Sequence, residues 1–275
     1  MPNKEPDQYA VFGNPIAHSK SPMLHEAFAK QCGQSMSYRA ILADADRFAE
    51  TLHAFITSGG SGANVTLPFK LEAYQLCTSL TNRARAAGAV NTLRFAQGQI
   101  LGDNTDGYGL VQDIMHNAGI TIEGKRILLL GAGGAARGAL LPLLEQHPAE
   151  LVIANRSMHK ARDLHIEFQN HGTIRISDFA QLQGQFDIVI NATSASISDQ
   201  RPPLPDSIYK TGTLAYDMMY AAQPTRFMAH AALHQALVRD GWGMLVEQAA
   251  EAFFVWRGVR PQTRELLDRE SLLVR

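Results

Sequence analysis

The stretch "RILLLGAGGAARGALLPLL", residues 126–144, decides the fold of half of this chain. An apolar run with the composition of a buried strand leads into a cluster of glycines, and an apolar helix follows. Gly131 permits the tight turn, Gly133 lets backbone N–H groups approach a pyrophosphate, and the small Ala135 allows the helix to pack close to the strand. The stretch therefore predicts a dinucleotide-binding βα unit, with a plain tight turn as the alternative, because short glycine motifs recur by chance.

A second strand in "LVIANRS", residues 151–157, ends at Asn155, 24 residues after Gly131, close to the spacing at which dinucleotide-binding folds meet the adenosine ribose. An NAD site usually has Asp or Glu at this point, and a carboxylate repels a 2′-phosphate. This chain has Arg156 instead, whose planar guanidinium can bind that phosphate through two hydrogen bonds, and Lys160 adds positive charge. The pattern favours NADP(H). In the alternative reading, both cations only solvate a loop and a helix face.

A third strand, "FDIVIN" at residues 186–191, runs into the polar residues Thr193 and Ser194. The carboxyl ends of parallel strands lie along one edge of a sheet, so we expect Thr193 to face the same crevice as the glycine cluster. There it would contact the nicotinamide half of the cofactor. Hydroxyls that only cap a loop have the same appearance in a sequence.

Strand-like and helix-like stretches alternate along the rest of the chain. "YAVFG" at 9–13 reads as a strand, and "SPMLHEAFAKQCG" at 21–33 reads as a helix. This alternation predicts an α/β fold with parallel sheets. We place a substrate-binding α/β domain at 1–106, completed by a C-terminal helix within 241–275, and a Rossmann-type NADP-binding domain with a parallel sheet at 107–240.

Composition and charge point to a small-molecule partner. The 275 residues carry a formal net charge of −1, with 45% hydrophobic and 19% charged residues, so neither nucleic acid nor an anionic membrane is favoured. The two cysteines form no C-x-x-C motif and the N-terminus lacks the apolar stretch of a signal peptide, which fits a cytoplasmic protein. No H-E-x-x-H motif and no G-x-S-x-G elbow occur, so neither a metal site nor serine acyl transfer is predicted. The sequence does not fix the oligomeric state, and a homodimer is compatible with it.

Polar residues beside predicted helix starts mark the half of the chain that would hold the substrate. Ser21 precedes Pro22 and is the predicted N-cap of a helix. With Ser19 it would form a compact site for a carboxylate, although a serine cap without a ligand is the more frequent case. Lys70 falls in the first turn of a helix that Pro68 is expected to start, where the helix dipole opposes a cation.

A lysine at such a position either extends into solvent or serves a function. Asp106, in the glycine loop "GDNTDGYG" at residues 102–109, supplies a carboxylate that could pair with Lys70, and Asn91 precedes that loop. No side chain carries a hydride. Redox chemistry would therefore need the cofactor, while the protein positions the substrate and handles the proton.

Several blocks of the sequence together resemble the NADP-dependent shikimate dehydrogenase family. They are "GNPIAHSKSP", "GANVTLPFK", "AGAVNT", "GDNTDG", "GAGGAA", "NRS", "NATS", "YDMMY" and "GMLVEQA", in this order along nearly the whole chain. The resemblance implies the reversible, NADPH-dependent reduction of 3-dehydroshikimate to shikimate, a step of aromatic amino-acid biosynthesis. It also implies a two-domain α/β enzyme with a cleft between its domains.

The resemblance further implies a set of site residues. Lys70 and Asp106 would be the proton-transfer pair, because an ammonium can stabilise the negative charge on the keto oxygen and pass it a proton. The residues implied to bind the substrate are Ser19, Ser21, Thr66, Lys70, Asn91, Asp106, Tyr220 and Gln248. Those implied to bind NADP(H) are Gly131, Ala132, Gly133, Gly134, Ala135, Asn155, Arg156, Ser157, Lys160, Met218 and Gly241, to which the third strand adds Thr193.

Two positions depart from the family's pattern. Asn82 stands where members often have Glu or Asp near the cofactor, and Ser196 stands where Gly is usual, which puts the loop geometry after Thr193 in question. Two alternatives stay open. A quinate/shikimate dehydrogenase that uses NAD(H) or both cofactors would be expected to have an acid near the end of the second strand. A catalytically silent NADPH-binding module would need no proton donor.

Overall fold

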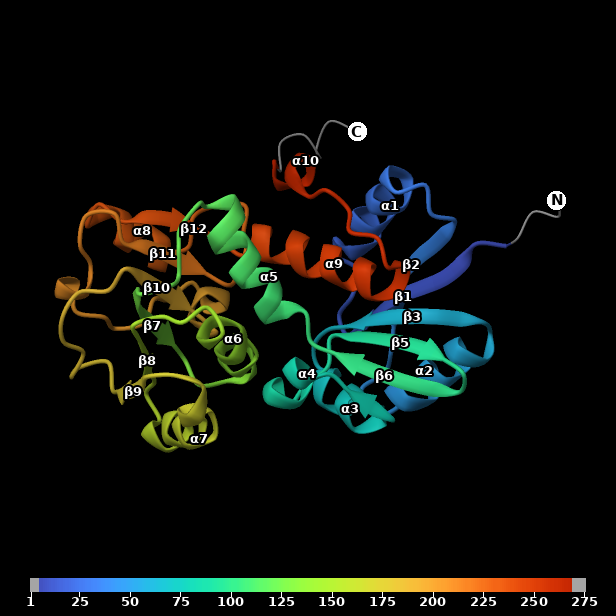
Figure 1. Cartoon of the computed structure of the whole chain (residues 1–275), viewed down its shortest axis with the longest axis horizontal. Coiled ribbons are helices and arrows are strands. Elements are labelled where there is room, and N and C mark those ends of the chain that lie inside the picture. Colours follow the sequence, from blue (N-terminus) through green and yellow to red (C-terminus); the bar gives the residue numbers. More distant parts are fainter. Residues whose placement is uncertain (1–4, 269–275) are drawn as a thin grey trace. The chain divides into compact units, whose positions relative to one another are not determined.

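The computed structural model describes residues 5–268, which form two compact units (Figure 1). The first unit runs to Gly109 and resumes at Val246, and the second unit is Leu110–Leu245. Each unit contains one six-stranded sheet with helices, which confirms the predicted α/β class. None of the described helices is long and apolar enough to cross a membrane.

The sheet of the first unit is mixed, with the strand order β2-β1-β3-β5-β6-β4. Its strands are β1 (Asp7–Gly13), β2 (Met36–Leu42), β3 (Gly60–Val65), β4 (Ser79–Leu80), β5 (Thr92–Ala96) and β6 (Gln99–Asp103). β1, β2 and β3 are parallel, whereas β5 is antiparallel to both of its neighbours. The parallel arrangement expected of the whole chain stops at β5, because Gln97 and Gly98 adopt positive φ and close a tight hairpin between β5 and β6.

Alternate side chains of β1 face two different cores, as the period of a strand requires. Phe12 packs against α2 (Phe48–Thr57) and α3 (Lys70–Leu76) on one face of the sheet. Tyr9 packs against Trp256 of α9 (Trp242–Arg257) on the other face, the two ring centroids being 4.7 Å apart. The remaining helices of this unit are α1 (Ser21–Gln31), α4 (Asn82–Ala87), α5 (Asp106–Gln112, which crosses into the second unit) and α10 (Arg264–Leu267).

The sheet of the second unit is entirely parallel, with the order β12-β11-β10-β7-β8-β9. Its strands are β7 (Arg126–Leu130), β8 (Glu150–Ala154), β9 (Ile174–Ser177), β10 (Ile188–Asn191), β11 (Leu214–Asp217) and β12 (Leu237–Arg239). This is the Rossmann strand order. Successive strands are added to one side of β7 up to β9, and from β10 onwards they are added to its other side. Residues 127–130 of β7 are fully buried, as expected of a central parallel strand covered on both faces.

Three α-helices connect these strands, namely α6 (Gly134–Leu144), α7 (Met158–Phe168) and α8 (Arg226–Leu233). Short turns of helix complete the unit, namely η1 (Asp113–Asn117), η2 (Gln169–His171), η3 (Ala195–Ser198) and η4 (Asp206–Ile208). Because each α-helix starts beside the carboxyl end of the preceding strand, the turns that hold the predicted cofactor residues gather along that edge of the sheet.

Three local predictions for the first unit were wrong. Ser21 is not an N-cap but the first residue of α1, because the cap position falls on Lys20. Pro68 does not start a helix, because it lies in a turn with a cis peptide bond and α3 begins at Lys70. Asp106 does not lie in a glycine loop, because residues 106–112 are helical and Asp106 is the first residue of α5.

Candidate active site

The Lys70 and Asp106 side chains form an ion pair in the first unit. Lys70 Nζ lies 2.6 Å from Asp106 Oδ2, and the two side chains are 27% and 24% exposed. Both residues are the first of their helices, where a carboxylate is favoured and an ammonium is not. The carboxylate therefore offsets the unfavourable position of the ammonium. An ammonium has three hydrogens to donate, so Lys70 can bind a further acceptor while it keeps this partner.

Asn91 connects the ion pair to Gln248 of α9. Asn91 Nδ2 donates to Asp106 Oδ1 at 2.7 Å and lies 3.3 Å from Gln248 Oε1, while Asn91 Oδ1 accepts the backbone N–H of Thr105 at 2.9 Å. Asn91 and Gln248 are both buried. A buried network whose groups are hydrogen-bonded holds its side chains in fixed orientations. Four of the predicted substrate residues are thus brought together, although they come from distant parts of the sequence.

Asn64 of β3 extends the same network to the first helix. Its Oδ1 accepts from the Tyr38 hydroxyl at 2.7 Å and from His25 Nε2 at 3.2 Å, and its Nδ2 donates to the carbonyl oxygen of Asn91 at 3.2 Å. Burial lowers the pKa of His25 to about 3, against the opposing effect of its hydrogen bond to Asn64, so the imidazole is neutral. The polar groups therefore form one connected chain from His25 and Tyr38 through Asn64 and Asn91 to the ion pair.

Ser19, Ser21 and Thr66 lie in two segments that meet beside the sheet. Ser19 Oγ accepts the backbone N–H of Ser21 at 3.3 Å. The backbone N–H of Thr66 donates to the carbonyl oxygen of Phe12 at 2.9 Å. A Cβ on Gly13 would collide with the Thr66 methyl group, so glycine is required for this close approach. The end of β1, which leads to the two serines, therefore lies against the residue that follows β3.

The glycine cluster of the second unit forms the turn between β7 and α6. Gly131 has a φ of +104°, which favours glycine, and its N–H donates to the carbonyl oxygen of Ala154 at 2.8 Å. A Cβ on Gly133 or Gly134 would meet no other atom within 4 Å. Gly133 is the N-cap residue of α6 and has no side chain to cap it, so the first N–H groups of the helix face open space. The predicted phosphate turn comprises Gly131, Ala132, Gly133, Gly134 and Ala135.

The corner after β8 presents two cations. Asn155 Nδ2 donates to the carbonyl oxygen of Ser157 at 2.9 Å, which braces the corner. Arg156 and Lys160 are exposed. Within residues 5–268, the guanidinium of Arg156 makes no hydrogen bond or ion pair. A guanidinium that is not already paired can bind a dianionic phosphate with both of its donor edges.

A cluster of polar side chains fixes the loop after β10. Thr193 Oγ1 donates to Asn191 Oδ1 at 2.7 Å. Ser196 Oγ donates to Asp217 Oδ2 at 2.6 Å and accepts from Asn191 Nδ2 at 3.1 Å. Ser196 lies in η3 and does not have positive φ, so its backbone conformation does not require glycine. The serine that replaces the family's usual glycine therefore causes no backbone strain, and its side chain adds two hydrogen bonds.

Met218 and Gly241 lie side by side in the second unit. The backbone N–H of Met218 donates to the carbonyl oxygen of Asn191 at 3.0 Å, and a Cβ on Gly241 would overlap the carbonyl of Met218. Both residues therefore belong to the same sheet edge as the glycine turn. Tyr220 is also in the second unit, with its ring edge-on to Trp242 at 5.8 Å between centroids. It is the one predicted substrate residue that the first unit does not contain.

Asn82, the other departure from the family's pattern, belongs to the first unit. It follows the N-cap Thr81, and its Oδ1 accepts from Arg85 Nη1 at 2.8 Å. This hydrogen bond lies within one turn of α4, so Asn82 supports its own helix.

Sequence reasoning missed the polar residues behind the predicted site. Asn64, Tyr38 and His25 carry the hydrogen bonds that hold Asn91 from behind, and Thr105 holds its amide oxygen. A signal was present for Asn64, which stands inside the apolar strand "ANVTL" where a polar side chain must find a partner on burial. No local pattern distinguishes Tyr38 or His25 from ordinary residues of an amphipathic strand and helix.

Three family models match successive parts of the chain. The model described as Shikimate dehydrogenase substrate binding domain matches residues 11–93, and the model described as Shikimate / quinate 5-dehydrogenase matches residues 110–198. The model described as Shikimate 5'-dehydrogenase C-terminal domain matches residues 241–267.

Curated relatives and solved structures cover almost the whole chain. A protein of Herminiimonas arsenicoxydans named Shikimate dehydrogenase (NADP(+)) is 60% identical over 94% of both chains. The crystal structure of an Ael1 enzyme from Pseudomonas putida is 48% identical with a TM-score of 0.91, covering 95% of this chain and 97% of that one. A shikimate 5-dehydrogenase from Thermus thermophilus, solved in complex with NADP(H) and shikimate, is 29% identical with a TM-score of 0.86, covering 98% and 99%.

Proposed function

Because the chain belongs to the shikimate dehydrogenase family, we propose that it catalyses the reversible, NADPH-dependent reduction of 3-dehydroshikimate to shikimate. The observation that carries this proposal is the Lys70–Asp106 ion pair, which Asn91 joins to Gln248. All four residues belong to the first unit, and Lys70 and Asn91 lie within the match to the substrate-binding model.

The second unit has the features that NADP(H) requires. Gly133 and Gly134 leave open the space that side chains would fill, so a pyrophosphate can approach the start of α6. Arg156 is available to pair with the 2′-phosphate, and the neighbouring Asn155 does not repel that phosphate as a carboxylate would. When bound, NADPH supplies the hydride that no side chain can carry. The alternative of an NAD(H)-dependent enzyme would be expected to have an acid at this corner, and none of residues 155–157 is acidic.

Lys70 is the proposed proton donor. Negative charge develops on the keto oxygen of the substrate as the carbonyl is reduced, and Lys70 Nζ passes a proton to this oxygen. In the oxidation direction the same nitrogen accepts the proton of the hydroxyl group. Asp106 Oδ2 holds Nζ, and the hydrogen bond from Asn91 fixes Asp106 Oδ1, so the direction of the ammonium is set before the substrate binds.

Neutral polar groups around this pair suit a polyhydroxylated ring. We assign Asn91, Gln248 and Thr66 to the ring hydroxyls of the substrate. A substrate that lacks one of these hydroxyls would leave a buried amide or hydroxyl of the protein without a hydrogen-bond partner, and would therefore bind more weakly. Ser19 and Ser21 are assigned to the carboxylate, on the basis of their adjacent hydroxyls at the start of α1. Tyr220 is the remaining predicted substrate contact and is half-exposed in the second unit.

The proposal is tested by initial rates with shikimate and quinate side by side, each with NADP⁺ and then with NAD⁺. We expect the combination of shikimate and NADP⁺ to have the highest kcat/KM. Equal or better catalytic efficiency with NAD⁺ would contradict the assignment of Arg156, and no turnover of shikimate with either cofactor would contradict the function itself. The predicted cytoplasmic location and the homodimer stay predictions, and the latter is checked by light scattering.

A further inference from the structure

Three side chains of the second unit converge on one point outside the proposed active site. His230 and His234 lie four residues apart, at the end of α8, and Asp206 lies in η4. His230 Nε2 is 3.1 Å and His234 Nε2 is 3.5 Å from the same carboxylate oxygen, Asp206 Oδ1. One ligand atom of each residue lies within 4.8 Å of the other two.

From this geometry we propose that Asp206, His230 and His234 form a binding site for a divalent transition-metal ion, Zn²⁺ foremost. Donor atoms around a tetrahedral Zn²⁺ with bonds of about 2.0–2.2 Å stand about 3.3–3.5 Å apart, which is close to the two measured separations. Two imidazole nitrogens and one carboxylate oxygen are a donor set that Zn²⁺ accepts. Asp206 is 65% exposed, so water can complete the coordination.

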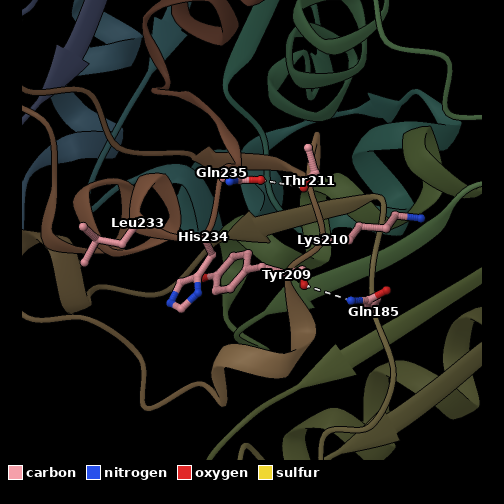
Figure 2. A pocket seen from close by; sticks show the side chains of 7 residues that line it. All are labelled: Gln185, Tyr209, Lys210, Thr211, Leu233, His234 and Gln235. Carbon is pink, nitrogen blue, oxygen red and sulfur yellow. Dashed lines mark hydrogen bonds between the residues drawn. The ribbon is translucent and has the colours of Figure 1, made fainter.

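The surroundings of the cluster hold its rings in place. The Tyr209 ring stacks on the His234 ring, with centroids 5.5 Å apart and planes within 5°, and the two rings lie next to each other in Figure 2. Tyr209 also touches the His230 ring at 5.9 Å, and its buried hydroxyl has no hydrogen-bond partner among the described residues.

This cluster lies at the opposite edge of the sheet from the predicted cofactor residues. The cofactor turns follow the carboxyl ends of β7, β8 and β10, whereas α8 ends shortly before the start of β12 and η4 precedes β11. His234 lines a surface hollow together with Tyr209 and Gln235, and His230 lines a neighbouring one. A metal ion here would tie η4 to α8 and stabilise the unit, without contact to the cofactor turns.

Part of the proposed metal site can be recognised in the sequence. "HAALH", residues 230–234, has the spacing of the two histidines in H-E-x-x-H but lacks the glutamate, so a search for the full motif misses it. The third ligand comes from the short helix η4, more than twenty residues earlier, which no local spacing reveals. The prediction that the chain has no metal site stands against this proposal, and the titration below decides between the two.

Titration of the metal-free protein with ZnCl₂ in a calorimeter tests the proposal. We expect one equivalent to bind, with affinity reduced at least tenfold in Asp206→Asn and in His234→Gln, and unchanged in His116→Ala, which removes an exposed histidine elsewhere in the same unit. Asp206→Asn keeps the experiment decisive should a histidine variant fold poorly, because Asp206 is mostly exposed.

Two further readouts use the same proteins. Co²⁺ in the site should give the visible absorption bands of tetrahedral coordination in the wild type and lose them in His234→Gln. Saturating Zn²⁺ should raise Tm of the wild type by several degrees and leave that of Asp206→Asn unchanged, because binding to the folded state alone stabilises it. Equal Zn²⁺ affinity in the wild type, Asp206→Asn and His234→Gln would overturn the proposal.

Discussion

Replacing Lys70 by Met removes the ammonium and keeps the length of the side chain, which separates its chemistry from its packing. The contacts of Asp106 indicate how much folding free energy this substitution removes. Asp106 would lose one partner at Oδ2, but Oδ1 keeps the 2.7 Å hydrogen bond from Asn91, and the carboxylate is 24% exposed, so water can replace the ammonium. A partly exposed ion pair contributes about 1 kcal/mol, which corresponds to a fall in Tm of about 2–4 °C for a chain of this size.

The expected cost to catalysis is much larger. A positioned general acid typically contributes about 10²–10⁴-fold, which is about 3–5 kcal/mol of transition-state stabilisation. We therefore expect kcat for shikimate oxidation to fall by about two to four orders of magnitude in Lys70→Met, while NADPH affinity and Tm change little. The assays are steady-state kinetics, titration of NADPH fluorescence and thermal unfolding. Lys30→Met, which removes an exposed lysine at the end of α1, is the matched control.

Two outcomes would refute this reasoning. A kcat of Lys70→Met within about threefold of the wild type would remove the ammonium from the reaction. A fall in Tm well beyond the few degrees expected would show that Lys70 is mainly structural, and the loss of activity would then report unfolding.

Three further outcomes are expected. Arg156→Ala should lower kcat/KM for NADPH by about 10–100-fold and leave kcat/KM for NADH unchanged, because a charge-assisted phosphate contact worth about 1.5–3 kcal/mol is lost. Arg162→Ala removes another exposed arginine of the same unit and is the control in the same kinetic assay. Gly243→Ala should destabilise the second unit by more than about 2 kcal/mol, because the new Cβ would overlap the buried Asp113 carboxylate. This carboxylate binds Arg239 and Tyr216, and the overlap would disturb both contacts. An unchanged midpoint of urea unfolding would contradict this prediction. The pKa of His25 is about 3 in the folded protein but near 6.5 in the unfolded chain, which therefore binds the proton first as the pH falls. The free energy of unfolding should decrease as the pH drops from 6.5 towards 3, by at most about 1.4 kcal/mol per pH unit. Urea titrations at several pH values should show a shallower pH dependence of stability in His25→Gln.

Much of the second unit follows from local sequence. The apolar run of β7, the glycines after it and the helix that follows are adjacent in the chain, so their geometry is set by neighbouring residues. The role of Arg156 was predicted in the same way, since its distance along the chain from Gly131 reflects the length of one βα unit. The first unit was harder to predict, because its sheet contains an antiparallel strand and its helix starts are shifted by one or two residues from the positions that Ser21 and Pro68 suggested.

The amino-acid sequence by itself determined the α/β class, the glycine turn after β7, the two cations after β8, and the resemblance to one family. Each depends on residues close together in the chain, or on blocks recognised one at a time. Only the tertiary structure decided that Lys70 meets Asp106, that Asn91 meets Gln248, and that Asp206 lies beside the "HAALH" segment. Contacts of this kind depend on strand order, on register and on how a helix lies against its sheet, and these are fixed by the packing of the whole unit rather than by any segment of it.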